Sequence, residues 1–386
     1  MSVQPKVMFY VQHLLGIGHL ARASRIAHAL AADGFDVTMV TGGTPVAGFP
    51  GAGVEHVALP AILAGDAGFS GLTDIHGRPV DDAFKAHRRD LLLRTFETIR
   101  PDIVIIEAFP FGRRQVRFEL LPLLDAIHAM QKDRPLVLTS LRDILQERSK
   151  AGRDEETIAV VQKYFDGVLV HGDPTFARLE ETFPLARQIR DKILYTGLVA
   201  APDAVSLPSP TDEKFDIVVS AGGGAVGREL IEAASAAAQK IQGQSWCLIT
   251  GPNLPQADFD AIVAQAPAGV KVFRFRQDFA SLLAGAKLSV SQAGYNTVCD
   301  ILRAGCRSLL VPFTAGGETE QSVRAERLER LDMACVLPEA KVATDMRCAI
   351  ADMLGRAAPL EHKLDLEGAV RTAEILRELL HDKAVA

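Results

Sequence analysis

Two residues of the first half of the chain combine acid–base chemistry with positions that a ligand can reach. His19 follows the glycine turn at residues 16–18 and begins a predicted helix, and Glu107 ends the apolar run of residues 101–107. The positive end of a helix favours a neutral imidazole, the form that a base requires. A carboxylate at the end of a buried parallel strand lies where open sheets bind their ligands. We therefore expect His19 and Glu107 to be catalytic, one of them as a general base, and their types alone do not rank them.

A second stretch, residues 287–321, predicts a phosphate site. Ser291 ends a short strand, Gly294 breaks the run, and a helix follows over residues 295–304. Backbone N–H groups and the dipole at such a helix start attract phosphate. Asp300 lies one turn inside this helix and can accept hydrogen bonds from ribose hydroxyls. The residues expected around a bound nucleotide in this stretch are Ser291, Gly294, Tyr295, Asn296, Asp300, Glu320 and Gln321.

The elements that must position these residues alternate between strand and helix in both halves of the chain. In the first half, a strand at residues 6–11 leads through a glycine loop into a helix at 19–32 and a strand at 35–41. In the second half, residues 215–220 and 228–242 repeat the strand–glycine loop–helix order. This alternation predicts an α/β fold with two Rossmann-like domains and parallel sheets. The glycine-rich residues 65–77 are instead expected to form an exposed loop.

Residues 287–321 resemble the donor-binding region of GT-B glycosyltransferases, and in particular of family 28. In that family a Ser-x-x-Gly turn opens a helix whose acidic residue binds the ribose of a UDP-sugar, and the following loop carries a polar pair for the sugar. The matching positions are Ser291, Gly294, Asp300, Glu320 and Gln321. The family usually has Glu at the position of Asp300, and Gln is common at the position of Glu320, so the identity of the sugar stays open.

The resemblance implies a GT-B architecture, with a cleft between the two domains. The domain boundaries that we predict are an acceptor domain over residues 1–197, a proline-containing linker over 198–212, a nucleotide-sugar domain over 213–363, and a last helix within 364–386 that packs back towards the first domain. The resemblance also implies further donor contacts, which are the diphosphate loop Gly222, Gly223 and Gly224 and the base-contacting edge Arg276 and Gln277.

The acceptor is expected on the first domain. The family's first loop is rich in glycine and carries a histidine at the helix start, which corresponds here to Gly16-Ile17-Gly18-His19. Two arginines on the loop after Glu107 suit a carboxylate or a phosphate, because a guanidinium can bind either in a bidentate manner. The acceptor-binding residues that we predict are His13, Gly16, Gly18, Arg113 and Arg114.

The activity implied is transfer of a sugar from a nucleotide-sugar, which we expect to be UDP-linked, with inversion at the anomeric carbon. No carboxylate pair suited to bridging a diphosphate and Mg²⁺ is visible, so we expect neither a metal nor a cofactor besides the donor. Two alternatives stay open: a UDP-sugar epimerase or hydrolase of the same fold, and a non-catalytic nucleotide-sugar-binding protein. Product analysis separates the first alternative from a transferase.

A dinucleotide-dependent enzyme is a further alternative, because Gly16-x-Gly18-x-x-Ala21 matches the dinucleotide fingerprint. In that fingerprint the first glycine directly follows the strand, whereas here several residues intervene. The second strand ends in Thr41-Gly42-Gly43, which offers no carboxylate for a ribose hydroxyl. We therefore do not expect NAD.

Composition bounds the remaining possibilities. The net charge of −6 argues against general nucleic-acid binding, which needs a basic surface. The 5 cysteines are an odd number without CxxC spacing, which favours reduced thiols in a cytoplasmic protein. The N-terminal residues do not have the pattern of a signal peptide, and no run of about 18 apolar residues occurs. We expect any membrane contact to be peripheral.

Overall fold

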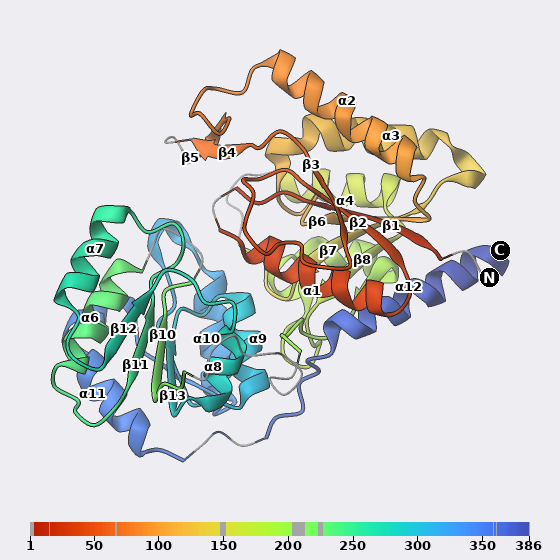
Figure 1. The fold of residues 1–386 in the computed structure, drawn as a ribbon. Coiled ribbons are helices and arrows are strands. Elements are labelled where there is room, and N and C mark those ends of the chain that lie inside the picture. Colours follow the sequence, from red (N-terminus) through yellow and green to blue (C-terminus); the bar gives the residue numbers. More distant parts are fainter. Residues whose placement is uncertain are drawn as a thin grey trace. The chain divides into compact units, whose positions relative to one another are not determined.

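The computed structural model describes residues 4–14, 16–65, 68–146, 152–202, 213–222, 227–357, 359 and 361–385. The chain forms two compact units, Met1–Val199 with Glu367–Ala386, and Ala200–Leu366 (Figure 1). Each unit contains one large sheet, and every strand pair within these two sheets is parallel. The predicted α/β fold with two Rossmann-like sheets is confirmed.

Unit 1 is built on a 7-stranded sheet of order β3-β2-β1-β6-β7-β8-β9. Its strands are β1 (Lys6–Val11), β2 (Asp36–Thr41), β3 (Glu55–Ala58), β6 (Ile103–Glu107), β7 (Leu136–Arg142), β8 (Gly167–His171) and β9 (Ile193–Tyr195). The central strand β6 is buried along its whole length, because helices cover both faces of the sheet. Polar residues that bind a ligand are therefore expected at the carboxyl ends of these strands, where the chain leaves the buried sheet and enters loops.

The helices of unit 1 are α1 (Gly18–Ala32), α2 (Asp82–Ile99), α3 (Arg117–Ala129), α4 (Arg153–Tyr164), the short α5 (Leu179–Thr182) and α12 (Gly368–Val385). Helix α12, from the end of the chain, lies along α1 (Figure 1), where the Arg377 guanidinium pairs with the Asp33 carboxylate. The start of α12 approaches the backbone so closely that a Cβ on Gly368 would lie 2.4 Å from the carbonyl oxygen of Gly197. The last helix thus belongs to the first unit.

A buried ion pair joins α2 and α3 to the sheet. The Arg88 side chain donates to both carboxylate oxygens of Glu119 at 2.7 Å, and neither side chain has any exposure. Arg88 also donates to Gln12 Oε1 at 2.7 Å and to the carbonyl oxygen of Gly42 at 3.0 Å, and Tyr10 donates its hydroxyl to Glu119. Because every partner is desolvated, loss of one of them would leave an uncompensated charge in the core.

One predicted element of unit 1 is wrong. Residues 65–77, expected to form a loop, contribute to an antiparallel hairpin of β4 (Leu63–Gly65) and β5 (Gly68–Thr73). Backbone pairing between the two strands forms this hairpin. The sequence did not predict it, because these glycine-rich residues do not alternate between apolar and polar.

Unit 2 is built on a 6-stranded parallel sheet of order β12-β11-β10-β13-β14-β15. Its strands are β10 (Ile217–Ser220), β11 (Trp246–Ile249), β12 (Val270–Phe273), β13 (Leu288–Ser291), β14 (Ser308–Leu310) and β15 (Cys335–Val336). Its helices are α6 (Arg228–Ala238), α7 (Gln256–Gln265), α8 (Phe279–Gly285), α9 (Tyr295–Ala304), α10 (Glu320–Arg330) and α11 (Val342–Gly355). Helices α6 and α11 pack against each other and share one apolar core with the strands. Within the described residues, no helix of either unit combines the length and the hydropathy of a membrane span.

Candidate functional site

The two residues predicted to be catalytic are in direct contact. His19 lies in the first turn of α1, and Glu107 is the last residue of β6. The imidazole Nδ1 of His19 lies 2.8 Å from Glu107 Oε1. The Arg22 guanidinium donates to the same oxygen, and Ser140 Oγ donates to Glu107 Oε2 at 2.5 Å. Parallel topology brings these groups together, because a helix that follows one strand begins at the edge where the next strand ends.

Electrostatics fix the charge of both groups at neutral pH. Burial alone would raise the pKa of Glu107, but the Arg22 charge and the hydrogen bonds from His19 and Ser140 lower it to about 2. Burial and then the positive charge of Arg113 lower the pKa of His19 to about 3, against the opposing effect of Glu107. Glu107 is therefore ionised. His19 is neutral, as predicted, although burial rather than the helix dipole is the largest cause of its lowered pKa.

The protonation states also assign the tautomer of His19. An ionised carboxylate only accepts hydrogen bonds, so the proton of the neutral imidazole is on Nδ1, and this N–H donates a hydrogen bond to Glu107. This leaves the lone pair on Nε2, and within the described part of the chain no group hydrogen-bonds that atom. The side chain of His19 is 20% exposed, whereas that of Glu107 has no exposure. His19 is thus the member of the pair that a substrate can reach.

The two arginines of the loop after β6, both predicted to bind the acceptor, have different partners in the structure. Arg113 adopts a left-handed backbone (φ 54°) and donates through Nε to the carbonyl oxygen of Gln12 at 2.7 Å. Burial and the neighbouring Arg142 lower the pKa of Arg113 to about 10, which leaves it charged. Arg114 instead pairs with Glu156 of α4. Of the two, Arg113 is electrostatically coupled to His19, whereas Arg114 ties its loop to a helix.

His13 has a structural setting. Its Nε2 lies 3.0 Å from the carbonyl oxygen of Thr44, and the residue is 5% exposed. The ring lies against Gly43, where a Cβ would come within 2.5 Å of its Cε1 atom. The predicted glycines Gly16 and Gly18 flank Ile17, the N-cap of α1, so they shape the turn that delivers His19.

On unit 2, the predicted phosphate-binding helix forms as expected. Helix α9 begins at Tyr295, and its N-cap residue is Gly294, which has no side chain with which to cap the helix. Gly294, Tyr295 and Asn296 thus form the start of this helix. Ser291, at the end of β13, is buried, and its hydroxyl lies 2.8 Å from that of Ser289.

The residues predicted to bind the ribose and the sugar already have hydrogen-bond or ion-pair partners within unit 2. Asp300 is 3% exposed, and its Oδ1 accepts the backbone N–H of Ala201 at 3.0 Å. Glu320 is 2% exposed and pairs with Arg324 at 2.7 Å. Gln321 Oε1 accepts the backbone N–H of Phe313 at 3.1 Å. A ligand would have to share or replace these bonds.

The other residues predicted to contact the nucleotide-sugar differ in whether they already have partners. Arg276 pairs with Glu213 and Asp278, and its side chain is 9% exposed, so its guanidinium is already paired on two sides. Gln277 is exposed next to it. In the diphosphate loop, Gly222 has a φ of 74°, which favours glycine. Gly223, Gly224 and most of the predicted linker lie outside the described residues.

Sequence reasoning missed two positively charged residues that organise these sites. Arg22 lies one turn after His19, and the spacing of three residues along a helix would have indicated that both reach the same carboxylate. Arg324 lies one turn after Glu320 and donates to the carbonyl oxygen of Ala293 at 3.0 Å, so it joins α10 to the loop before α9. The spacing of charged residues along each helix was the available signal.

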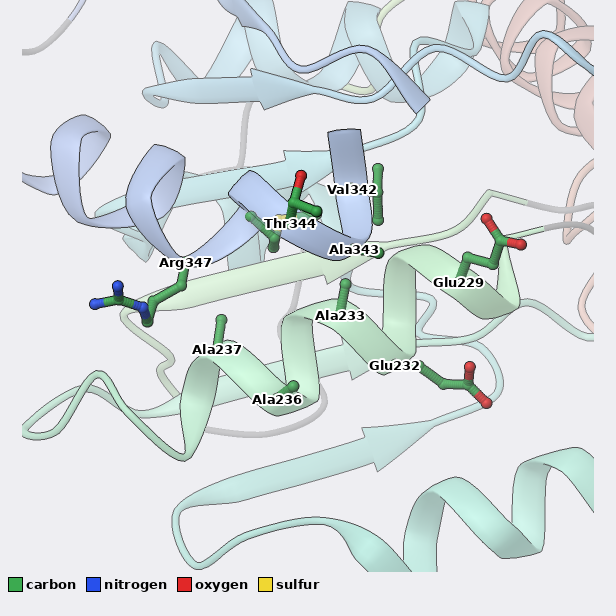
Figure 2. Close-up of a pocket in the computed structure, with 10 residues that line it drawn as sticks. Glu229, Glu232, Ala233, Ala236, Ala237, Val342, Ala343, Thr344 and Arg347 are labelled. Carbon is green, nitrogen blue, oxygen red and sulfur yellow. The ribbon is translucent and has the colours of Figure 1, made fainter. Parts of the chain in front are cut away.

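A hollow on unit 2 lies apart from all predicted site residues. It has a volume of about 550 Å³ and lies between α6 and α11, and its lining includes several alanines and Val342 together with the polar residues Glu229, Glu232, Thr344 and Arg347 (Figure 2). No predicted donor or catalytic residue lines it. The candidate site therefore lies at the carboxyl ends of the strands and not at this hollow.

The described residues hold no group of three or more His, Cys, Asp or Glu side chains that could bind a metal ion. One Asp-x-Asp triplet occurs, Asp258 to Asp260 in α7. Asp258 pairs with Arg228, and Asp260 accepts a hydrogen bond from Gln256, so both carboxylates are used on the surface of that helix.

Comparison with known proteins identifies unit 2. Residues 217–367 match the glycosyltransferase family 28 C-terminal domain. These residues are therefore similar to the C-terminal domain of family 28. The match begins at β10 and ends directly before α12, so it covers the whole sheet of unit 2.

Curated relatives agree with this assignment over part of their length. The chain is 27% identical over 201 residues to a transferase of Gloeobacter violaceus, covering 48% of this chain and 55% of the relative. It is 32% identical over 144 residues to one of Xanthomonas axonopodis pv. citri, covering 36% and 34%. Both relatives are UDP-N-acetylglucosamine--N-acetylmuramyl-(pentapeptide) pyrophosphoryl-undecaprenol N-acetylglucosamine transferases. The matches span about half or less of these relatives.

Solved structures extend the likeness to the whole fold. The calicheamicin glycosyltransferase aligns with a TM-score of 0.59 at 18% identity, covering 98% of this chain and 95% of that one. MurG of Acinetobacter baumannii aligns with a TM-score of 0.59 at 16% identity, covering 97% and 100%. The kitacinnamycin glycosyltransferase aligns with a TM-score of 0.64 at 14% identity, covering 98% and 100%. The fold is GT-B, and the predicted resemblance to family 28 is confirmed.

Proposed function

We propose that the protein is a glycosyltransferase that moves a sugar from a nucleotide-sugar to an acceptor hydroxyl, with His19 as the general base. The observation that carries the proposal is the contact of His19 with the ionised Glu107, on a chain that also matches the family 28 C-terminal domain over residues 217–367. A neutral imidazole held by a buried carboxylate is the arrangement that a general base requires.

The contacts of the pair support a ranking that the sequence did not provide. Glu107 has no exposure and already accepts hydrogen bonds from His19, Arg22 and Ser140. His19 Nε2 is the basic atom that an acceptor hydroxyl can approach. Glu107 then orients the ring and stabilises the imidazolium that forms, rather than acting as the base.

In the proposed reaction, the acceptor O–H bond breaks and its proton moves to His19 Nε2. The acceptor oxygen attacks the anomeric carbon as the bond from that carbon to the diphosphate oxygen breaks. The electron pair of that bond leaves with the nucleoside diphosphate, and a single displacement inverts the anomeric centre. We propose that the leaving charge is stabilised by the start of α9, without a metal ion.

The low pKa of His19 in the free protein bears on the acceptor. A base with a pKa of about 3 is weak, and part of the lowering comes from Arg113 and Arg22. An anion bound next to Arg113 would offset these charges and raise the pKa of His19 towards a working value. We therefore propose that the acceptor carries a carboxylate or phosphate close to the hydroxyl that reacts.

We propose a UDP-linked donor bound by unit 2. The named curated relatives act on UDP-N-acetylglucosamine, and the family match covers unit 2. Asp300 would accept ribose hydroxyls in addition to the Ala201 N–H, since a carboxylate has about four lone-pair sites. A thymidine-linked donor is the second candidate, because a structural neighbour, the glycosyltransferase VinC, was solved with DTDP.

A titration of the full chain with UDP, dTDP and their sugars tests the donor. A ligand at about 100 times its dissociation constant adds roughly 2.7 kcal/mol of stability, which a thermal melt resolves. We expect stabilisation by UDP above that by dTDP, and the reverse order would move the assignment to thymidine. Product analysis with an acceptor library then separates transfer from epimerisation or hydrolysis of the donor, and binding without turnover would support a binding protein.

The cysteines support the predicted compartment. Cys247, Cys299, Cys306, Cys335 and Cys348 are all free thiols. Free thiols are typical of a reducing compartment. We propose that the protein acts in the cytoplasm, and fractionation of cells that produce the tagged chain tests this.

A further inference from the structure

A chain of hydrogen bonds extends from Glu107 into the core of unit 1, on the side away from His19. Ser140 Oγ donates to Glu107 Oε2 at 2.5 Å and lies 2.9 Å from His171 Nε2. His171 Nδ1 lies 2.8 Å from Thr196 Oγ1. All four residues have no exposure. The first three lie at the carboxyl ends of the adjacent strands β6, β7 and β8, and Thr196 directly follows β9.

The ionised carboxylate sets the direction of every bond in this chain. Glu107 can only accept, so the single proton of Ser140 points to Glu107. Ser140 must then accept from His171, which places the proton of His171 on Nε2. His171 is neutral, because burial and the Arg22 charge lower its pKa to about 3. Its Nδ1 therefore accepts the hydroxyl proton of Thr196.

Thr196 has two other acceptors within reach, the carbonyl oxygens of Gly197 at 2.9 Å and of Val170 at 3.5 Å. If the hydroxyl proton pointed to either of them, the lone pair of a hydroxyl oxygen would face the lone pair of His171 Nδ1 at 2.8 Å. Such a contact is repulsive and leaves a buried acceptor unsatisfied, at a cost of about 1–3 kcal/mol. The orientation towards His171 avoids this cost, so all three bonds point to the carboxylate and polarise one another.

We propose that Ser140 and His171 are positioning residues, which hold Glu107 Oε2 so that Oε1 stays aimed at Nδ1 of His19. This inference rests on the proposed function of His19 and Glu107. Oε1 is contacted by His19 and Arg22, and Oε2 by Ser140, so the Ser140 hydroxyl opposes rotation of the carboxylate towards the Arg22 side. The Nε2–H of His171 donates to the Ser140 oxygen, and this hydrogen bond opposes rotation of the Ser140 hydroxyl away from Glu107.

The direction of the chain can be tested without a substrate. Protein labelled with ¹⁵N-histidine gives two-bond ¹H–¹⁵N spectra that distinguish the two neutral tautomers, and a His171→Gln variant assigns the signal. At neutral pH we expect His171 to carry its proton on Nε2 and His19 on Nδ1. The Thr196→Val variant removes the donor to Nδ1 at nearly constant shape and should disturb the His171 signal, whereas Thr196→Ser keeps the hydroxyl and should restore it. A proton on Nδ1 of His171 in the wild-type protein would overturn the proposal.

A double-mutant cycle tests the effect on catalysis. With an acceptor from the library, we expect Ser140→Ala to lower kcat by roughly tenfold to a hundredfold, the scale of a misplaced catalytic group, with an unchanged KM for the donor. In a Glu107→Gln background, Ser140→Ala should have less than about a twofold further effect, because residues that act through one partner are not additive. Equal losses in both backgrounds would show a general structural effect and overturn the proposal. A melting temperature for each variant checks that it folds.

The same cycle separates this inference from the proposed function. If Glu107→Gln lowers kcat and Ser140→Ala does not, the positioning role is wrong and the base assignment stands. If Glu107→Gln keeps full kcat, the proposed role of the carboxylate fails, and the positioning role fails with it.

Discussion

The variant Glu107→Gln tests the proposed base most directly, because it keeps the shape of the side chain and removes its charge. The imidazolium formed during transfer lies 2.8 Å from the carboxylate oxygen. With an effective dielectric constant of about 20, two unit charges at this separation attract by about 6 kcal/mol. Arg22 contacts the same oxygen and takes up part of this attraction. We therefore expect a loss of roughly 10²- to 10⁴-fold in kcat.

Removal of the charge has a second consequence that the assay must separate. Arg22 is 3% exposed at its side chain, so Glu107→Gln leaves a buried cation without its carboxylate and costs about 3–5 kcal/mol of stability. Assays are therefore run well below the melting temperature of the variant, and kcat is referred to folded protein. Initial rates at saturating donor and acceptor give kcat, and calorimetry gives the donor affinity.

A matched control is available in the same unit. Glu156 also pairs with arginines, Arg114 and Arg117, but its side chain is 38% exposed and it lies on α4. Glu156→Gln should change kcat by less than about twofold, since exposed ion pairs contribute little. Equal kcat values in Glu107→Gln and Glu156→Gln would refute the role of Glu107, and a change in UDP affinity in Glu107→Gln would contradict a donor site confined to unit 2.

Four further predictions concern pH, the donor, metal and stability. The pKa of about 3 for His19 means that the base is already deprotonated in the free protein, so kcat/KM should show no limb from His19 between about pH 5 and 8; a limb near the usual histidine value would contradict the burial argument. Asp300→Ala should weaken UDP binding by roughly 1.5–3 kcal/mol in calorimetry, and unchanged affinity in a folded variant would remove Asp300 from the donor site. Turnover should survive EDTA, and loss that Mg²⁺ restores would establish a metal requirement. Arg88→Met should lower the free energy of unfolding in a urea titration by about 3–5 kcal/mol, since it leaves the buried Glu119 carboxylate without its cation and with the Tyr10 hydroxyl as a neutral donor; a loss below about 1 kcal/mol would show that the pair is dispensable.

The sequence predicted the regular elements of the parallel sheets well. The helix expected at residues 295–304 is α9, with the same ends, because a glycine stands before its start and another at its end. The strand expected at 6–11 is β1. Topology also indicated that His19 and Glu107 share one edge of a doubly wound sheet, and their direct contact is an observation of the structure. Apolar periodicity and glycine positions carry this information.

The hydrogen-bond partners of the buried polar groups could not be predicted in the same way. Asp300 accepts the N–H of Ala201, which lies 99 residues earlier in the chain, and a backbone donor has no residue type that could identify it. Ser140 and His171 were visible as polar residues at strand ends. Their connection depends on the order of β6, β7 and β8 in the sheet and on rotamers that the sequence does not encode locally. Long-range polar contacts are therefore properties of the folded chain that residue types and spacing do not reveal.

The division of the chain between its two units decides which properties can be carried over from relatives. The family 28 match covers residues 217–367, all within or at the edge of unit 2, whereas His19, Glu107 and Arg113 lie in unit 1. A donor class can therefore be inferred from the matched domain, but the acceptor has to be inferred from the side chains of unit 1 themselves. Two guanidiniums of unit 1, those of Arg113 and Arg22, lower the pKa of His19. A search among hydroxyl acceptors that carry a carboxylate or phosphate follows from this charge, and an acceptor without such a group that reacts equally fast would show that Arg113 serves the fold alone.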